Sequence, residues 1–118
     1  MTQEEKKVLI QDICTRLPYE LKIEVCVKNK NIKSVDCVKY DTVGTYIRLM
    51  DDENFSIKLY LRPMSSMTEE EEWKYNYIKE NHTNWEAYDY LNSIHIDYRG
   101  LIPMGLAIEA PKDMYKTE

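Results

Sequence analysis

The sequence has few of the residues that break regular structure or build small cross-linked folds. Its 118 residues include 3 Gly, 4 Pro, 3 Cys and 1 Phe. With so few glycines, a glycine-rich phosphate-binding loop is excluded, and none of G-x-x-x-x-G-K-[ST], G-x-G-x-x-G and G-x-S-x-G occurs. Nucleotide-dependent enzymes of those classes are therefore excluded, as are collagen-like and low-complexity chains.

The three cysteines, Cys14, Cys26 and Cys37, are an odd number without C-x-x-C spacing. This pattern fits neither a disulfide framework nor a zinc site. No apolar run approaches the length of a membrane span, and no apolar stretch follows a basic start as in a signal peptide. We therefore expect a soluble cytoplasmic protein that does not insert into a membrane.

Hydrophobic residues make up 43% of the chain and charged residues 31%, which is typical of a folded globular domain. The length suits a single domain over residues 1–118. The net charge is -5, but residues 1–62 carry +1 and residues 63–118 carry -6. An acidic second half argues against broad binding to nucleic acid.

The first residues predict a helix that ends before Pro18. Thr2 and Glu5 match the S/T-x-x-E capping box that begins many helices. Apolar residues then recur at steps of three and four, namely Leu9, Ile10, Ile13, Cys14 and Leu17. Since Cys14 lies on this stripe, we expect its thiol to be buried and inert.

Residues 21–61 predict four short strands. Residues 21–27 alternate apolar and polar side chains, and after the turn residues Asn29–Asn31 a second strand follows at Val35–Tyr40. A turn centred near Asn31 would put Val25 opposite Val38, Ile23 opposite Tyr40 and Cys26 opposite Cys37. Thr45–Met50 and Phe55–Leu61 complete a predicted antiparallel meander.

Two further helices are predicted by two more capping boxes. Thr68 pairs with Glu71, and Thr83 with Glu86. Glu69–Glu72 lie in the first turn of the earlier helix, where the helix dipole favours negative charge. The expected buried aromatic residues are Trp73, Tyr77, Trp85 and Tyr88.

The tail combines apolar residues with breaks in regular structure. Four of the seven Gly and Pro residues lie between Gly100 and Pro111. The tail either packs across its own core, with a short edge strand at Leu106–Glu109, or forms an apolar patch that a partner covers. The predicted fold is α+β: an N-terminal helix, an antiparallel sheet of about four strands, two C-terminal helices and an ordered apolar tail.

One cluster has the residue types of a catalytic or metal site. Asp89, His95 and Asp97 could bind a divalent metal or act in acid/base catalysis. The only motif, however, is a lone H-x-D at a helix end, without the two-histidine spacing of H-E-x-x-H. A small metal-dependent or hydrolytic enzyme is therefore an alternative hypothesis. The leading prediction is a non-enzymatic protein without a cofactor.

A second alternative is nucleic-acid binding through the outer face of the sheet. Basic side chains and one aromatic ring are expected there: Lys22, Lys28, Lys58, Tyr60 and Arg62. Glu24 interrupts this face, and sheets that bind RNA present more than one aromatic residue in adjacent strands. A solvated charged face is the simpler interpretation.

The favoured hypothesis is a protein-interaction module that binds a protein partner or forms a homodimer. The chain has 10 Tyr, and the off-stripe residues Tyr75 and Tyr90 are expected to be exposed. Amphipathic rings of this kind are enriched at protein interfaces. The other predicted contact residues, on the tail, are Tyr98, Arg99, Leu101, Ile102 and Met104.

Four stretches together resemble a family of small uncharacterised proteins from gut Bacteroidetes and their phages and mobile elements. The stretches are Arg16–Tyr19, Tyr60–Glu71, His95–Ile102 and Gly105–Pro111. They occur in order and leave the predicted strands weakly matched. The resemblance implies an origin on a phage or mobile element and no particular activity.

Overall fold

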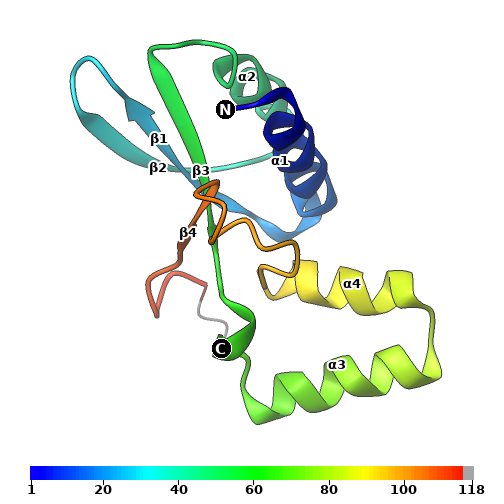
Figure 1. The fold of residues 1–118 in the computed structure, drawn as a ribbon. Coiled ribbons are helices and arrows are strands. Elements are labelled where there is room, and N and C mark those ends of the chain that lie inside the picture. Colours follow the sequence, from blue (N-terminus) through cyan, green and yellow to red (C-terminus); the bar gives the residue numbers. More distant parts are fainter. Residues whose placement is uncertain (116–118) are drawn as a thin grey trace.

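The computed structural model describes residues 1–115, which form a four-stranded mixed sheet with helices on one face and a helical hairpin beyond its end (Figure 1). The fold is α+β with an N-terminal helix, as the sequence predicted. Its main elements are α1 (Gln3–Thr15), β1 (Lys22–Val27), β2 (Ile32–Cys37), α2 (Val43–Leu49), β3 (Phe55–Leu61), α3 (Glu69–Asn81), α4 (Asn84–Ser93) and β4 (Ala107–Glu109). Short 3-10 turns lie at Leu17–Tyr19 and Met64–Ser66. No helix among these residues is long and apolar enough to cross a membrane.

The strand order is β2-β1-β3-β4, with β1 antiparallel to both neighbours and β4 parallel to β3. The prediction of a wholly antiparallel meander is therefore wrong, because β4 runs parallel to β3. After β3 the chain passes through α3 and α4 before it returns, and such a long crossover lets it re-enter the sheet in the same direction. The edge strand expected at Leu106–Glu109 is confirmed, since β4 covers Ala107–Glu109.

The predicted strand at Thr45–Met50 is a helix, α2. Its β-branched residues suggested a strand, but Val43, Tyr46, Leu49 and Met50 recur at steps of three and four and all pack against the core. Tertiary packing of this helical stripe outweighs the local strand preference.

The register of the β1–β2 hairpin also differs from the prediction. The turn is tight, at residues 28–31, with Asn31 in the left-handed region at φ 51°. Cys26 therefore lies opposite Lys33, and Cys37 opposite Lys22, so the two thiols are not cross-strand neighbours. Val38 is still buried, whereas Tyr40 lies beyond the strand and is 70% exposed.

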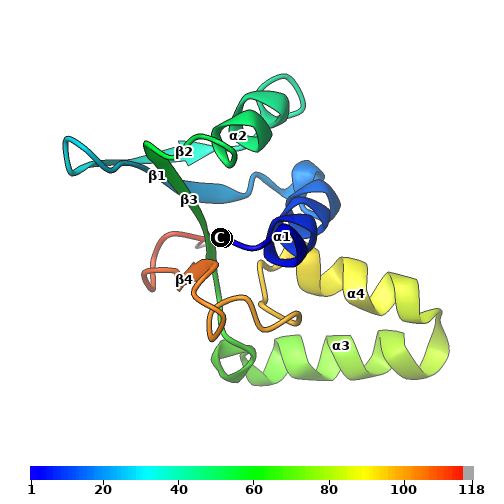
Figure 2. The same ribbon diagram turned by 45° about the horizontal axis from the view of Figure 1, so that its top comes forward.

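The core lies between one face of the sheet, α1, α2 and the returning tail (Figure 2). Its fully buried members come from α1, the sheet and the tail and include Leu9, Ile13, Ile23, Leu59 and Leu101, while α2 contributes partly buried residues. The buried stripe of α1 carries two charged residues, Asp12 and Arg16, alongside Leu9 and Ile13. Cys14 is exposed, contrary to the prediction, because this stripe turns it outward.

A tyrosine from the tail closes the end of the β1–β3 ladder. The register that pairs Ile23 with Leu59 would next pair Lys22 with Tyr60. There the hydroxyl of Tyr115 accepts a hydrogen bond from the Lys22 N–H (2.8 Å) and donates one to the Tyr60 carbonyl (2.8 Å). The phenol therefore replaces one rung of backbone hydrogen bonds, and burial raises its pKa well above the ordinary value.

We predict that Tyr115→Phe lowers the free energy of unfolding by about 1–3 kcal/mol, because the Lys22 N–H and the Tyr60 carbonyl lose their partner. Urea unfolding at pH 7 measures this change. Tyr40→Phe is the matched control, since Tyr40 is 70% exposed, and it should change stability by less than about 0.5 kcal/mol. Equal effects of the two substitutions would show that the Tyr115 hydroxyl is not part of the ladder.

Candidate functional site

A buried ion pair lies where α1, α4 and the tail meet. Asp12 lies on α1 and Arg16, four residues later, caps the end of this helix, and both side chains are fully buried. Nε of Arg16 donates to one oxygen of Asp12 (2.8 Å) and Nη2 donates to the other (3.2 Å). Nη2 also donates to the backbone carbonyl of Ile96 (2.7 Å), so the pair on α1 fixes the segment that follows α4.

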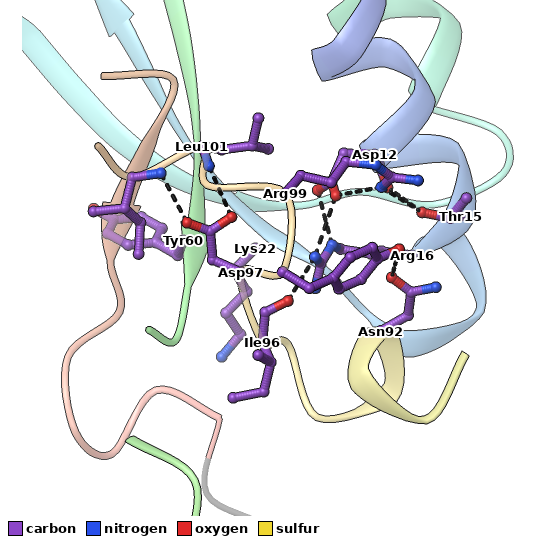
Figure 3. A network of polar contacts seen from close by, with 12 residues as sticks. Asp12, Thr15, Arg16, Lys22, Tyr60, Asn92, Ile96, Asp97, Arg99 and Leu101 are labelled. Carbon is purple, nitrogen blue, oxygen red and sulfur yellow. Dashed lines mark hydrogen bonds and ion pairs between the residues drawn. The ribbon is translucent and has the colours of Figure 1, made fainter. Parts of the chain in front are cut away.

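Arg99 is a second cation on the same carboxylate. Its Nη1 donates to Asp12 (2.6 Å), and its side chain is 21% exposed, so this arginine reaches the surface (Figure 3). Both guanidinium groups, of Arg16 and Arg99, lie over the ring of Tyr98, at 5.3 and 4.9 Å from its centre. The cluster of Asp12, Arg16 and Arg99 therefore has one more positive charge than negative.

The turn after the cluster is held by Asp97. One carboxylate oxygen accepts a hydrogen bond from the N–H of Leu101 (2.8 Å) and the other from the N–H of Ile102 (2.9 Å). Gly100 provides the left-handed backbone that the turn requires, at φ 76°. The tail is thus packed on the core, which is the first of the two arrangements considered from the sequence.

His95 ends α4 in a strained conformation. It occupies the left-handed position of a Schellman motif, at φ 63°, where glycine is usual. The N–H of Ile96 bonds to the Leu91 carbonyl, and the N–H of His95 to the Asn92 carbonyl. The imidazole stacks on Tyr115 at 3.6 Å between ring centres. Burial, together with the charges of nearby basic groups, lowers the pKa of His95 to about 4.

A pocket of about 450 Å³ opens beside the ion cluster. It lies between α1, α4 and the segment after α4, and its lining residues are Thr15, Trp85, Tyr88, Asp89, Asn92, Tyr98 and Arg99. The rings of Tyr88 and Tyr98 lie 5.2 Å apart, and the Tyr98 hydroxyl donates to Asn92 (2.8 Å). We call this the aromatic pocket.

The helical hairpin leaves its large aromatic residues in solvent, contrary to the prediction that they are buried. Trp73 is 67% exposed and Trp85 72%, while Tyr77 and Tyr88 are each 49% exposed. No residue of α3 is fully buried. The buried apolar residues of the hairpin lie on α4, namely Ala87 and Leu91. A bidentate ion pair between Arg62 and Glu71, at 2.9 and 2.7 Å, holds the start of α3.

The predicted contact residues are divided between the surface and the core. Tyr98 and Arg99 are half-buried and line the aromatic pocket, and Met104 is 44% exposed. Leu101 is fully buried and Ile102 packs against the core, so the structure leaves Leu101 no surface to offer a partner.

Tyr75 and Tyr90 are half-buried, although the sequence predicted that both are exposed. Lys79 lies over the ring of Tyr75 and Lys74 over that of Tyr90. Neither tyrosine belongs to the aromatic pocket.

The candidate metal or acid/base cluster does not assemble. Asp89 accepts a hydrogen bond from Tyr19 (2.7 Å), which raises the pKa of that phenol to about 12. His95 faces Tyr115, and Asp97 holds backbone N–H groups. Among residues 1–115 no three His, Cys, Asp or Glu side chains are placed to hold a metal ion. The side chains of Asp89, His95 and Asp97 are therefore engaged with Tyr19, with Tyr115 and with backbone N–H groups rather than with one another.

The outer sheet face is less open than the nucleic-acid hypothesis requires. Arg62 is paired with Glu71, and the Tyr60 hydroxyl donates to Glu24 (3.3 Å). Lys22 donates to the backbone carbonyl of Met114 (3.2 Å) in the tail. Three of the proposed contact groups therefore already have partners within the chain.

Sequence reasoning missed Asp12, Arg16 and the exposure of Trp85. The spacing of Asp12 and Arg16 by four residues marks a helical ion pair, but nothing in that spacing indicates burial. Comparison of the chain with protein-family models, with curated proteins and with solved structures finds no similar protein.

The depressed pKa of His95 makes stability depend on pH. The pKa of His95 is near 6.5 in the unfolded chain and near 4 in the folded chain. The contribution of the neutral His95 to stability is therefore fully present above about pH 6.5 and is lost as the pH falls toward 4. We predict that the native protein loses on the order of 3 kcal/mol of unfolding free energy in this interval through His95 alone.

His95→Asn tests this, because asparagine tolerates the left-handed backbone and does not titrate. Urea unfolding of both proteins at pH 7 and pH 4 should show the larger loss in the native protein. The carboxylates titrate in both proteins, so the difference isolates His95. Identical losses in both proteins would contradict a buried neutral imidazole.

Proposed function

We propose that the protein is a non-catalytic protein-interaction module. Its contact surface is the aromatic pocket, including the exposed residues Trp85 and Tyr88 of α4. The observation that carries the proposal is the 72% exposure of Trp85 beside a pocket lined by Tyr88, Tyr98 and Arg99. Tryptophan, tyrosine and arginine are the residues that dominate binding energy at protein interfaces.

The rigidity of this surface supports the proposal. Tyr98 is held by Asn92 and by two guanidinium groups, and Arg99 is held by the buried carboxylate of Asp12. A partner would therefore meet side chains that are already ordered, which lowers the entropic cost of binding. The exposed side chain of Trp85 presents a large apolar area to solvent, and a partner that covers this area would remove it from water.

The proposed setting is the cytoplasm, where residues such as Cys14, Cys26 and Cys37 stay reduced. An accessory role on a phage or mobile element is also part of the proposal. It rests on the four sequence stretches that resemble that family. The partner is a different protein or a second copy of this chain.

Affinity capture from the native host tests the proposal. We expect a recurrent protein partner whose recovery falls at least about tenfold for the double variant Trp85→Ala and Tyr88→Ala, because hot-spot truncations cost 2 kcal/mol or more. Tyr40→Ala is the matched control, since Tyr40 is 70% exposed and lies outside the pocket lining.

A partner that binds all three proteins equally would place the contact surface elsewhere. If no recurrent partner is captured, and the pure protein also sediments as a strict monomer, the interaction role itself is contradicted.

A further inference from the structure

The outer side of α3 is an unpartnered helix face. Its residues recur at steps of three and four and are all exposed: Glu69, Glu70, Trp73, Asn76, Tyr77 and Glu80. The rings of Trp73 and Tyr77 stack at 5.5 Å between centres, with 20° between their planes. We call this the acidic-aromatic face.

Within the described part of the fold, the rings of this face make one further contact, between Tyr77 and His82 at 6.2 Å between ring centres. The opposite side of α3, which includes Glu71, Tyr75 and Ile78, is the less exposed one. The lysines of α3, Lys74 and Lys79, lie over Tyr90 and Tyr75. Among residues 1–115, no salt bridge involves any of the three glutamates of the acidic-aromatic face.

Helix stability explains only part of this charge. Glu69 and Glu70 lie in the first turn of α3, where the helix dipole favours carboxylates. Glu80, in the last turn, lies where the same dipole disfavours them. The carboxylate of Glu80 therefore does not stabilise the helix. Its position on the same face as two exposed rings favours a role in binding a partner.

We propose that the acidic-aromatic face binds a basic segment of a partner protein. Lysine or arginine side chains of that segment would lie over the rings of Trp73 and Tyr77 and pair with the surrounding carboxylates. Tryptophan is the strongest cation-π acceptor among the side chains. The same negative charge repels nucleic acid and anionic lipid surfaces, which leaves a basic protein segment as the complementary occupant.

This inference goes beyond the proposed function, because the face and the aromatic pocket share no residue. The binding should weaken as salt rises, since the three carboxylates are exposed and salt screens exposed charges, largely beyond about 8 Å at physiological ionic strength and at shorter distances as salt increases. The two surfaces can therefore be tested separately on the same full-length chain.

The test is a selection of displayed random dodecapeptides on the full-length chain at low salt. We expect the enriched peptides to contain an excess of lysine and arginine and to bind at least about tenfold more weakly to Trp73→Ala, while Trp85→Ala binds them unchanged. Trp85→Ala disturbs only the aromatic pocket, so failure of this inference and failure of the proposed function give different results.

Matched charge variants give the second readout. Replacement of Glu69, Glu70 and Glu80 by glutamine should abolish binding of the selected peptides. Replacement of three other exposed glutamates, Glu4, Glu53 and Glu109, changes the net charge equally and should leave binding intact. Circular dichroism of each variant checks that the helix content of the chain is unchanged.

Three results would overturn the proposal. The first is enrichment of peptides without basic residues, or no enrichment. The second is equal loss of binding in both glutamine variants, which would indicate net charge rather than this face. The third is self-association of the pure chain that needs Lys28, Lys30 and Lys33 of the β1–β2 hairpin, as sedimentation would reveal, because a second copy would then occupy the face.

Discussion

The carboxylate of Asp12 has no contact with solvent and connects three parts of the chain. Through Arg16 it binds α1 to the backbone of Ile96, and through Arg99 it reaches the surface beside the aromatic pocket. A buried ion pair adds little net stability, but loss of one partner leaves an uncompensated charge inside the protein. The cluster therefore acts mainly as a constraint on where the chain after α4 can lie.

This constraint determines how the tail and the helical hairpin are presented. Because the segment after α4 is fixed, Leu101 enters the core and β4 adds to β3. The hairpin is anchored at its other end by Arg62 and Glu71, its buried apolar residues Ala87 and Leu91 lie on α4, and it extends from the body (Figure 1). The large aromatic side chains of both helices are consequently displayed on a rigid frame, which is the arrangement that our functional proposals use.

Local signals predicted the parts of the fold that depend on local physics. The capping boxes at Thr2 and Thr68 and the alternation in residues 21–27 identified two helices and a strand, because each pattern satisfies backbone groups or buries one face over a few residues. The exposure of Trp73 could not be predicted, because a large apolar residue on a helical stripe normally faces a core. Long-range pairing also determines the parallel β4, which no local pattern shows. The sequence suggested His95 only as a candidate metal or acid/base residue, because its left-handed backbone and its stacking on Tyr115 depend on the folded chain.

Hydrogen exchange measured residue by residue tests most directly whether the Asp12 cluster fixes the tail. The account predicts that in the native protein the amides of Leu101 and Leu106 exchange as slowly as those of β1. In Asp12→Asn they should exchange at least about tenfold faster than the β1 amides, because the tail opens locally before the sheet does. Tail amides that exchange within seconds in the native protein, or that change in step with β1 in the variant, would contradict it.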